Sequence, residues 1–250
     1  MTNQMTGSSP WRYLLTDGEN EVLFRAAEVV GFFGVRSGDS WGTFDLVGEL
    51  VGPLDRVEQS EEAELVVVDQ GGNWLGAYFV GAPAITVVTT GDGNDARLRV
   101  KGFRPAWPGE AVEAVWSRWW SGRPQEAGAW VSYTDSEKTA WLEVARLHSR
   151  FHVSVEKSGP FVLDGRVVVD VPSFYCALGE AINGPGGYYG STLDGLADCM
   201  AGGFGPVAPF VLAWLRSEVA RSHLGANSER DYFAEIVHLL AEHGVEVRLE

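Results

Sequence analysis

The chain has 250 residues, of which 45% are hydrophobic and 21% charged, a composition typical of a folded protein with one or two packed cores. Its 34 acidic and 19 basic side chains give a net charge of −15, which disfavours direct binding to nucleic acid or to anionic lipid. The N-terminal stretch has no basic run followed by an apolar one, and no segment reaches the ~18 apolar residues of a membrane helix. These features predict a cytoplasmic protein without a membrane segment.

Short runs rich in β-branched and aromatic residues, separated by Gly, Asp and Asn, dominate the N-terminal part and predict antiparallel strands. The expected strands are Trp11–Thr16, Glu21–Val30, Thr43–Leu50, Glu64–Asp69, Trp74–Val80, Ile85–Thr90 and Arg97–Gly102. Two helices are expected to close this unit, from about Glu110 to Trp120 and from about Ser136 to His148. The second has Thr134 and Glu137 at the spacing of a capping box.

The rest of the chain alternates short strands with helices. Strands are expected at Phe161–Leu163, Arg166–Val169, Phe210–Trp214 and Val245–Leu249, and helices at Pro172–Ile182, Ser191–Ala201 and Ser228–Glu242. Strands separated by helices favour a small three-stranded parallel sheet flanked by helices. We therefore predict a strand-rich α+β domain at residues 1–157 and an α/β domain at residues 158–250.

One helix of the second domain carries a conspicuous pair of acids. Asp194 and Asp198 are four residues apart, so they share the face opposite the apolar stripe that contains Leu193 and Leu196. Like charges at this spacing destabilise a helix, and Tyr188 and Tyr189 place amphipathic rings beside them. Aromatic rings next to two carboxylates suit docking against a basic surface, although a capping role for Asp194 and a solvated Asp198 would be the ordinary interpretation.

The surrounding sequence resembles the barstar family, the intracellular inhibitors of barnase-type bacterial ribonucleases. The resemblance rests on VLDG (162–165), YYGSTLDGLADCM (188–200), PFVLAW (209–214) and the helix, glycine and strand order of HLLAEHGVEVRL (238–249). It covers roughly the last third of the chain. It implies a domain that blocks the active site of a basic ribonuclease or related nuclease toxin with its second helix and the preceding loop.

The resemblance also implies roles for individual residues. Tyr188 matches a contact tyrosine, Asp194 matches an aspartate that pairs with basic side chains, and Asp198 matches the aspartate that takes the place of a substrate phosphate. The full expected partner-binding set is Tyr188, Tyr189, Gly190, Thr192, Asp194, Ala197, Asp198, Phe204 and His243. No catalytic residue, metal or cofactor is expected, so the chain is predicted to be an inhibitor of the immunity or antitoxin type and not an enzyme.

Several positions depart from the family pattern. Thr192 stands where the family has asparagine, Ala197 where it has tryptophan, and His243 where it has an acidic residue. The loop after Cys199 lacks the family's tryptophan and offers Phe204 instead. These departures favour a diverged ribonuclease or related toxin as the target over barnase itself.

Two alternatives concern the N-terminal domain. It is a ligand-binding or enzymatic module if Asp45, Asp69, Asp92 and the tryptophans of Trp116–Trp120 converge on one cleft, with the barstar-like domain as a regulatory docking unit. A separate possibility is that it extends the inhibitory surface and gives two contacts to one target; in the leading hypothesis its role is unknown. The spacing of Trp116, Trp119 and Trp120 favours core packing, with an exposed aromatic anchor as the alternative. His148 and His152 are expected to form a surface pair without a metal.

Overall fold

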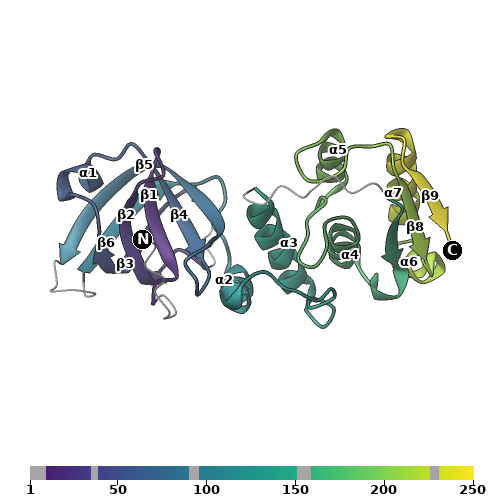
Figure 1. The fold of residues 1–250 in the computed structure, drawn as a ribbon, viewed down its shortest axis with the longest axis horizontal. Coiled ribbons are helices and arrows are strands. Elements are labelled where there is room, and N and C mark those ends of the chain that lie inside the picture. Colours follow the sequence, from purple (N-terminus) through teal and green to yellow (C-terminus); the bar gives the residue numbers. More distant parts are fainter. Residues whose placement is uncertain (1–9, 35–38, 90–95, 151–158, 226–230) are drawn as a thin grey trace, which may run out of the picture. The chain divides into compact units, whose positions relative to one another are not determined.

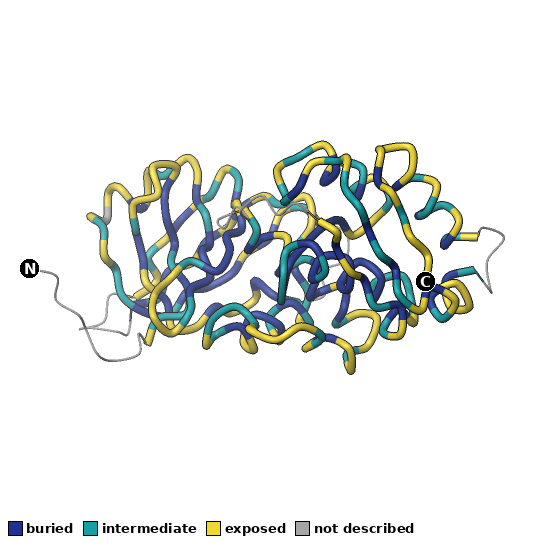
Figure 2. The backbone as a smooth tube through the Cα atoms, turned by 45° about the vertical axis from the view of Figure 1, so that its right-hand side comes forward, coloured by how far each residue is buried: buried dark blue, intermediate teal, exposed yellow. Residues whose placement is uncertain are grey.

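The computed structural model describes residues 10–34, 39–89, 96–150, 159–225 and 231–250. The chain divides into two compact units, residues 1–122 and 123–250, each with its own sheet (Figure 1). Each unit also has its own buried core, drawn dark blue in Figure 2. Among the described residues, no helix combines the length and apolar character needed to cross a bilayer.

The N-terminal unit is a closed barrel of six antiparallel strands in the order β1-β2-β3-β6-β5-β4. The strands are β1 (Tyr13–Asp17), β2 (Val22–Val30), β3 (Trp41–Leu50), β4 (Glu62–Val68), β5 (Trp74–Thr89) and β6 (Ala96–Phe103). The expected antiparallel strands are confirmed, with one difference: Trp74–Val80 and Ile85–Thr90 belong to a single strand, β5. The two halves read as separate strands because Gly81 and Pro83 interrupt the sequence between them, and the strand has a register irregularity between Gly81 and Ala84 at the same place.

Short helices accompany the barrel. Helix α1 (Leu54–Glu58) was not expected, whereas α2 (Glu110–Arg118) and the 3-10 turn η1 (Trp119–Ser121) fall where one helix was predicted. Trp116 and Trp119 are buried, and Trp116 Nε1 donates a hydrogen bond to Tyr78 Oη at 2.8 Å. Trp120 is half-buried beneath the Arg12 guanidinium. The core interpretation of these tryptophans is therefore confirmed for Trp116 and Trp119.

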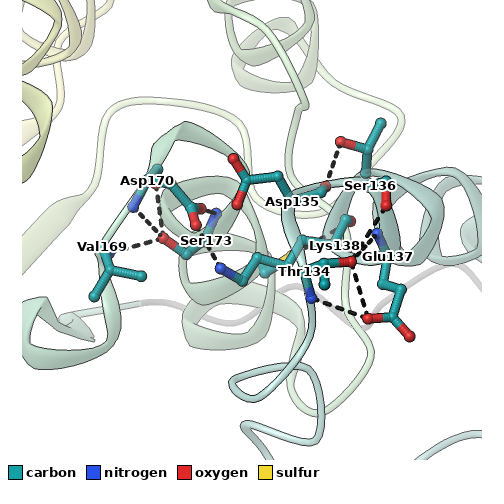
Figure 3. A network of polar contacts seen from close by, with 10 residues as sticks. Thr134, Asp135, Ser136, Glu137, Lys138, Val169, Asp170 and Ser173 are labelled. Carbon is teal, nitrogen blue, oxygen red and sulfur yellow. Dashed lines mark hydrogen bonds and ion pairs between the residues drawn. The ribbon is translucent and has the colours of Figure 1, made fainter.

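Helix α3 (Asp135–Ser149) begins with the predicted capping box: Thr134 Oγ1 accepts from the Glu137 amide, and the Glu137 carboxylate accepts from the Thr134 amide. This helix packs against α4 (Val171–Asn183), where Lys138 forms an ion pair with Asp170 (Figure 3). Its contacts group it with residues 123–250, although its position in the sequence suggested that it closes the N-terminal unit. Periodicity reveals an apolar face but not which core that face covers.

The C-terminal unit is built on a three-stranded parallel sheet in the order β7-β8-β9, as predicted. Its strands are β7 (Phe161–Asp164), β8 (Val211–Leu215) and β9 (Glu246–Leu249), and its further helices are α5 (Leu193–Ala201), α6 (Ser217–Leu224) and α7 (Tyr232–Glu242). Ring contacts join α4, β8 and α7 in the core: Phe174 stacks on Trp214, and Trp214 meets Phe233 at a tilt.

Two expectations for this unit need correction. The segment Arg166–Val169 is not a strand, because Asp164 accepts a hydrogen bond from the Arg166 amide and starts the 3-10 turn η2 (Gly165–Val167). Helix α6 was not expected; it follows Arg216, which has a left-handed backbone conformation and caps no amide with its side chain. The predicted start of the last helix at Ser228 lies outside the described residues, and α7 is described from Tyr232.

Candidate functional site

Helix α5 presents two carboxylates on its exposed side. The helix is capped by Thr192, whose Oγ1 accepts a hydrogen bond from the Gly195 amide at 3.0 Å. Asp194 lies in the first turn and Asp198 one turn later, and both are exposed. The buried side of the helix consists of Leu196, Cys199 and Met200. The spacing of four residues therefore places two negative charges next to each other on the surface.

Neither Asp194 nor Asp198 has a hydrogen-bonding or ion-pair partner for its carboxylate in the part of the chain that the structure describes. Their charges act on groups behind the helix. Burial raises the pKa of the Cys199 thiol to about 12, and the charge of Asp198 adds to this rise. Burial likewise raises the pKa of Tyr175, with a smaller contribution from Asp194. Two adjacent carboxylates without a counterion favour a positively charged partner.

Tyr188 lies in the loop before α5 and is only 4% exposed. Its ring meets that of Phe204 edge to face, with 5.3 Å between centroids, and its Oη lies 3.4 Å from Ser191 Oγ. Because Phe204 follows α5, this ring pair joins the loops on either side of the helix. Burial raises the pKa of the Tyr188 phenol, so the hydroxyl is a neutral donor at physiological pH.

Tyr189 and Gly190 lie inside the fold. Tyr189 is fully buried, and its Oη donates to the Pro206 carbonyl at 2.6 Å. Gly190 has a φ of 98°, and a Cβ at this position would lie 2.9 Å from Leu196 Cα, so only glycine fits. Both residues support the loop from within the fold, and their contact with a partner stays a prediction.

The remaining predicted contacts differ in how close they are to the carboxylates. Thr192 is exposed at the start of α5, and Ala197, next to Asp198, is half-buried. His243 is exposed at the C-terminal end of α7, which packs against α5. Its Nδ1 lies 2.9 Å from the Leu239 carbonyl. Tyr188, Thr192, Asp194, Ala197, Asp198 and Phe204 thus belong to one loop–helix–loop segment, whereas His243 comes from a neighbouring helix.

Asn183 is a site residue that the sequence analysis missed. It ends α4, and its side-chain amide donates to the Tyr188 carbonyl at 2.7 Å and to the Phe204 carbonyl at 2.8 Å. One side chain therefore ties together the two loops that flank α5. The available signal is the segment NGPGG (183–187), where an asparagine precedes a glycine-rich turn just after the expected helix Pro172–Ile182; this pattern indicates a helix end but not a link between two distant loops.

His148 and His152 were expected to form a surface pair that binds no metal. His148 is 5% exposed, so the expected surface position is wrong for this residue; it lies on the inner face of α3 with Ala145 and Val144. His152 lies outside the described residues. The described residues include no group of three or more His, Cys, Asp or Glu side chains that could hold a metal ion.

Two of the barrel acids considered as candidates for a ligand site, Asp45 and Asp69, are hydrogen-bonded within the barrel. Asp45 accepts hydrogen bonds from Arg97 Nε at 3.1 Å and from Arg99 Nε at 2.8 Å. Asp69 accepts from the amides of Gly71 and Asn73 in the turn between β4 and β5. Asp92 lies outside the described residues. The contacts of Asp45 and Asp69 favour structural roles for both.

Comparison with known families bears directly on α5. Along the chain, the helix and its flanking loops come between β7 and β8, two adjacent strands of the parallel sheet, and a small parallel sheet flanked by helices is what the sequence resemblance implied. Residues 159–250 match the family Barstar (barnase inhibitor). The Barstar region includes every predicted partner-binding residue. No family model matches the N-terminal region, and no curated protein matches the chain.

Proposed function

We propose that the Barstar region binds and blocks the active site of a basic microbial ribonuclease or related nuclease toxin, as an immunity-type inhibitor. The observation that carries this proposal is the pair of exposed carboxylates on α5, Asp194 and Asp198, which have no counterion among the described residues and lie inside the Barstar region. A ribonuclease active site supplies the missing counterions, because it binds substrate phosphates through cationic side chains.

In this mode the two aspartates mimic substrate phosphates. Asp198 occupies the place of the central phosphate, Asp194 pairs with a second basic side chain, and Tyr188 donates from its neutral hydroxyl. The net charge of −15 steers a cationic enzyme toward the acidic face and raises the association rate. The inhibitor performs no chemistry of its own, so no enzymatic activity is proposed, and its place of action is the cytoplasm.

The aromatic environment of the site favours a target that differs from barnase. Ala197 is small and half-buried beside Asp198, so this part of the surface offers little apolar area. Phe204 instead contributes a half-buried ring on Tyr188. A partner of this surface needs an apolar contact near Phe204 and fewer contacts over Ala197.

The test is a calorimetric titration of the full chain with barnase and with a secreted basic ribonuclease from the same source. We expect Asp198→Ala to weaken binding by at least about thirtyfold, the threshold of an interface hot spot near 2 kcal/mol. The matched control is Glu218→Ala, which removes an exposed carboxylate from α6. Equal affinities of the wild type and Asp198→Ala would contradict the proposed mode.

The same proposal predicts the salt dependence of association. Salt screens the attraction between the acidic face and a cationic partner. The association rate should therefore fall about tenfold or more between low salt and about 0.5 M salt, as measured by stopped flow. An association rate that does not change with salt would exclude electrostatic steering.

A further inference from the structure

A segment outside the Barstar region is part of the same compact unit. Residues 123–149 precede the family match, yet they pack on α4 within the unit 123–250. The ion pair between Lys138 and Asp170 joins the two helices (Figure 3). In addition, Cys176 Sγ donates to the Lys138 carbonyl. Lys138 is 3% exposed, so this contact is desolvated on the side of the lysine.

Arg123, at the start of this segment, binds the loop that leads to Tyr188. Its Nε donates to the Pro185 carbonyl at 2.6 Å, and its Nη2 donates to the Asn183 carbonyl at 2.8 Å. The guanidinium is planar, so it holds these two carbonyls in a fixed relative position. The arginine is half-buried, which strengthens both charge-assisted bonds relative to an exposed position.

Glu180 joins the same loop to the same segment from the side of α4. Its Oε2 accepts from the Gly128 amide at 2.7 Å, and its Oε1 accepts from the Gly186 amide at 3.0 Å. The loop also touches α4 directly, since a Cβ on Gly187 would lie 2.5 Å from the Gly179 carbonyl oxygen. Arg123 and Glu180 therefore both hold residues 183–187, and the Gly128 amide holds the Glu180 carboxylate.

Asn183 carries this restraint into the candidate site. Its backbone carbonyl accepts from Arg123, and its side-chain amide donates to the carbonyls of Tyr188 and Phe204. The path from Arg123 to the Tyr188–Phe204 ring pair thus contains one intervening residue. Arg123 itself touches neither ring in the described contacts, so it acts on the site through the loop.

We propose that residues 123–149 belong to the inhibitor and that Arg123 is a positioning residue that holds the 183–190 loop in its partner-binding conformation. This inference rests on the proposed function, because it assumes that Tyr188 and its loop contact the ribonuclease. The restraint lowers the entropy that the loop loses on binding, and a preordered loop binds more tightly for the same contacts. The Barstar region alone is then an incomplete inhibitor.

The test uses the full chain with Arg123→Gln, which removes the charge and the guanidinium fork, and Arg123→Lys, which keeps one charged donor. The matched control is Arg150→Gln, an exposed arginine just after α3. The first measurement, without any partner, is hydrogen exchange of the 183–190 loop. The second is the affinity for barnase and for a secreted basic ribonuclease from the same source.

We expect Arg123→Gln to speed exchange of the Gly186 and Gly187 amides about tenfold and to weaken ribonuclease binding about tenfold, because it removes the charged donor of both hydrogen bonds to the loop. Exchange in α7 should stay unchanged, which separates local loosening from global unfolding. Arg123→Lys should recover part of both effects.

The outcomes separate the two proposals. If the wild type binds a ribonuclease and Arg123→Gln leaves either the loop exchange or the affinity unchanged, the positioning role is overturned and the proposed function stands. Absence of wild-type binding to both ribonucleases, together with faster loop exchange in the variant, would overturn the proposed function while supporting the contact between Arg123 and the loop.

Discussion

Acidic side chains of the barrel and of helix α5 differ in what they contact. Asp17 accepts hydrogen bonds from Arg56, and Asp45 accepts from Arg97 and Arg99, so these barrel acids are neutralised within the unit. Asp194 and Asp198 on α5 have no such partner among the described residues. The two parts of the chain on either side of Gly159 carry similar net charges, −8 and −7. Net charge therefore says less about function than the pairing of each individual acid.

The largest stability effect is expected in the C-terminal unit, where one acid does have a buried partner. Lys138→Met should lower the unfolding free energy of residues 123–250 by about 3 kcal/mol, because it leaves the Asp170 carboxylate without its counterion. Although burial opposes it, hydrogen bonding from Lys138 and Ser173 holds the pKa of Asp170 below its usual value, so the carboxylate stays charged. Urea unfolding, with hydrogen exchange in α4 as a local probe, measures the loss of unfolding free energy.

The control for Lys138→Met is Lys101→Met on β6, where the lysine is exposed. Equal small effects of the two substitutions would show that the ion pair with Asp170 does not hold α3 on α4. Asp170 would then not differ from Asp194 and Asp198 in its contribution to the stability of the unit.

An intermediate loss of stability is expected for a substitution in the barrel core, which lies outside the proposed binding site. Trp116→Phe removes the hydrogen bond to Tyr78 Oη and part of the indole volume, and should cost about 1 to 2 kcal/mol of barrel stability. Ribonuclease binding should not change. The control, Trp41→Phe, alters a ring that is 51% exposed and should cost much less in thermal unfolding. A loss of binding in Trp116→Phe would instead connect the barrel with inhibition.

A smaller effect is expected for the paired barrel acid Asp45, and it depends on pH. Hydrogen bonds from Arg99, together with the charges of Arg99 and Arg97, hold the pKa of Asp45 below its ordinary value. Because the pKa is depressed, the contribution of Asp45 to barrel stability is complete above its unfolded-state pKa of about 4. This contribution is lost as the pH falls through its pKa in the folded state. Asp45→Asn should cost about 1 kcal/mol at neutral pH, since both arginines are half-exposed and screened.

The pH profile separates this contribution from general acid unfolding. The stability difference between the wild type and Asp45→Asn should narrow as pH falls below about 4, in urea titrations that follow the barrel. A difference that stays constant over this range would contradict the assigned pairing.

The smallest stability effect, of opposite sign, is expected for the unpaired acids. Asp198→Asn removes like-charge repulsion from Asp194 and should stabilise the C-terminal unit by ~0.2–0.5 kcal/mol while weakening ribonuclease binding. Asp194→Asn should stabilise the unit less, because the helix dipole favours a negative charge in the first turn. Thermal unfolding of both variants measures this, and clear destabilisation by Asp198→Asn would reveal a structural partner for this carboxylate.

Local chemistry made part of this molecule predictable. The capping box of α3 and the spacing of Asp194 and Asp198 depend on residues within one or two turns, and both are found as expected. The parallel sheet followed from the alternation of strands and helices. Turn η2 was mistaken for a strand because a single hydrogen bond from the Arg166 amide to Asp164 outweighs the β-branched composition of the segment.

Long-range contacts account for what the sequence could not reveal. Closure of the barrel requires β1 to pair with β4, and no local pattern encodes that pairing. Arg123 contacts the Asn183 carbonyl across 60 positions of the chain, so its part in the site is visible only in the folded unit. Tyr189 likewise depends on a distant residue, because its buried hydroxyl donates a hydrogen bond to the Pro206 carbonyl.

The open parallel sheet of the C-terminal unit has a consequence for behaviour at high concentration. In the described part of the chain, β7 and β9 are edge strands of four residues each, and exposed edges invite pairing between copies. Charged Glu246, Arg248 and Glu250 line β9 and its end, and Asp164 with Arg166 closes β7. Short, charged edges discourage aggregation, so the C-terminal unit can reach high concentration without copies of it assembling through their sheets.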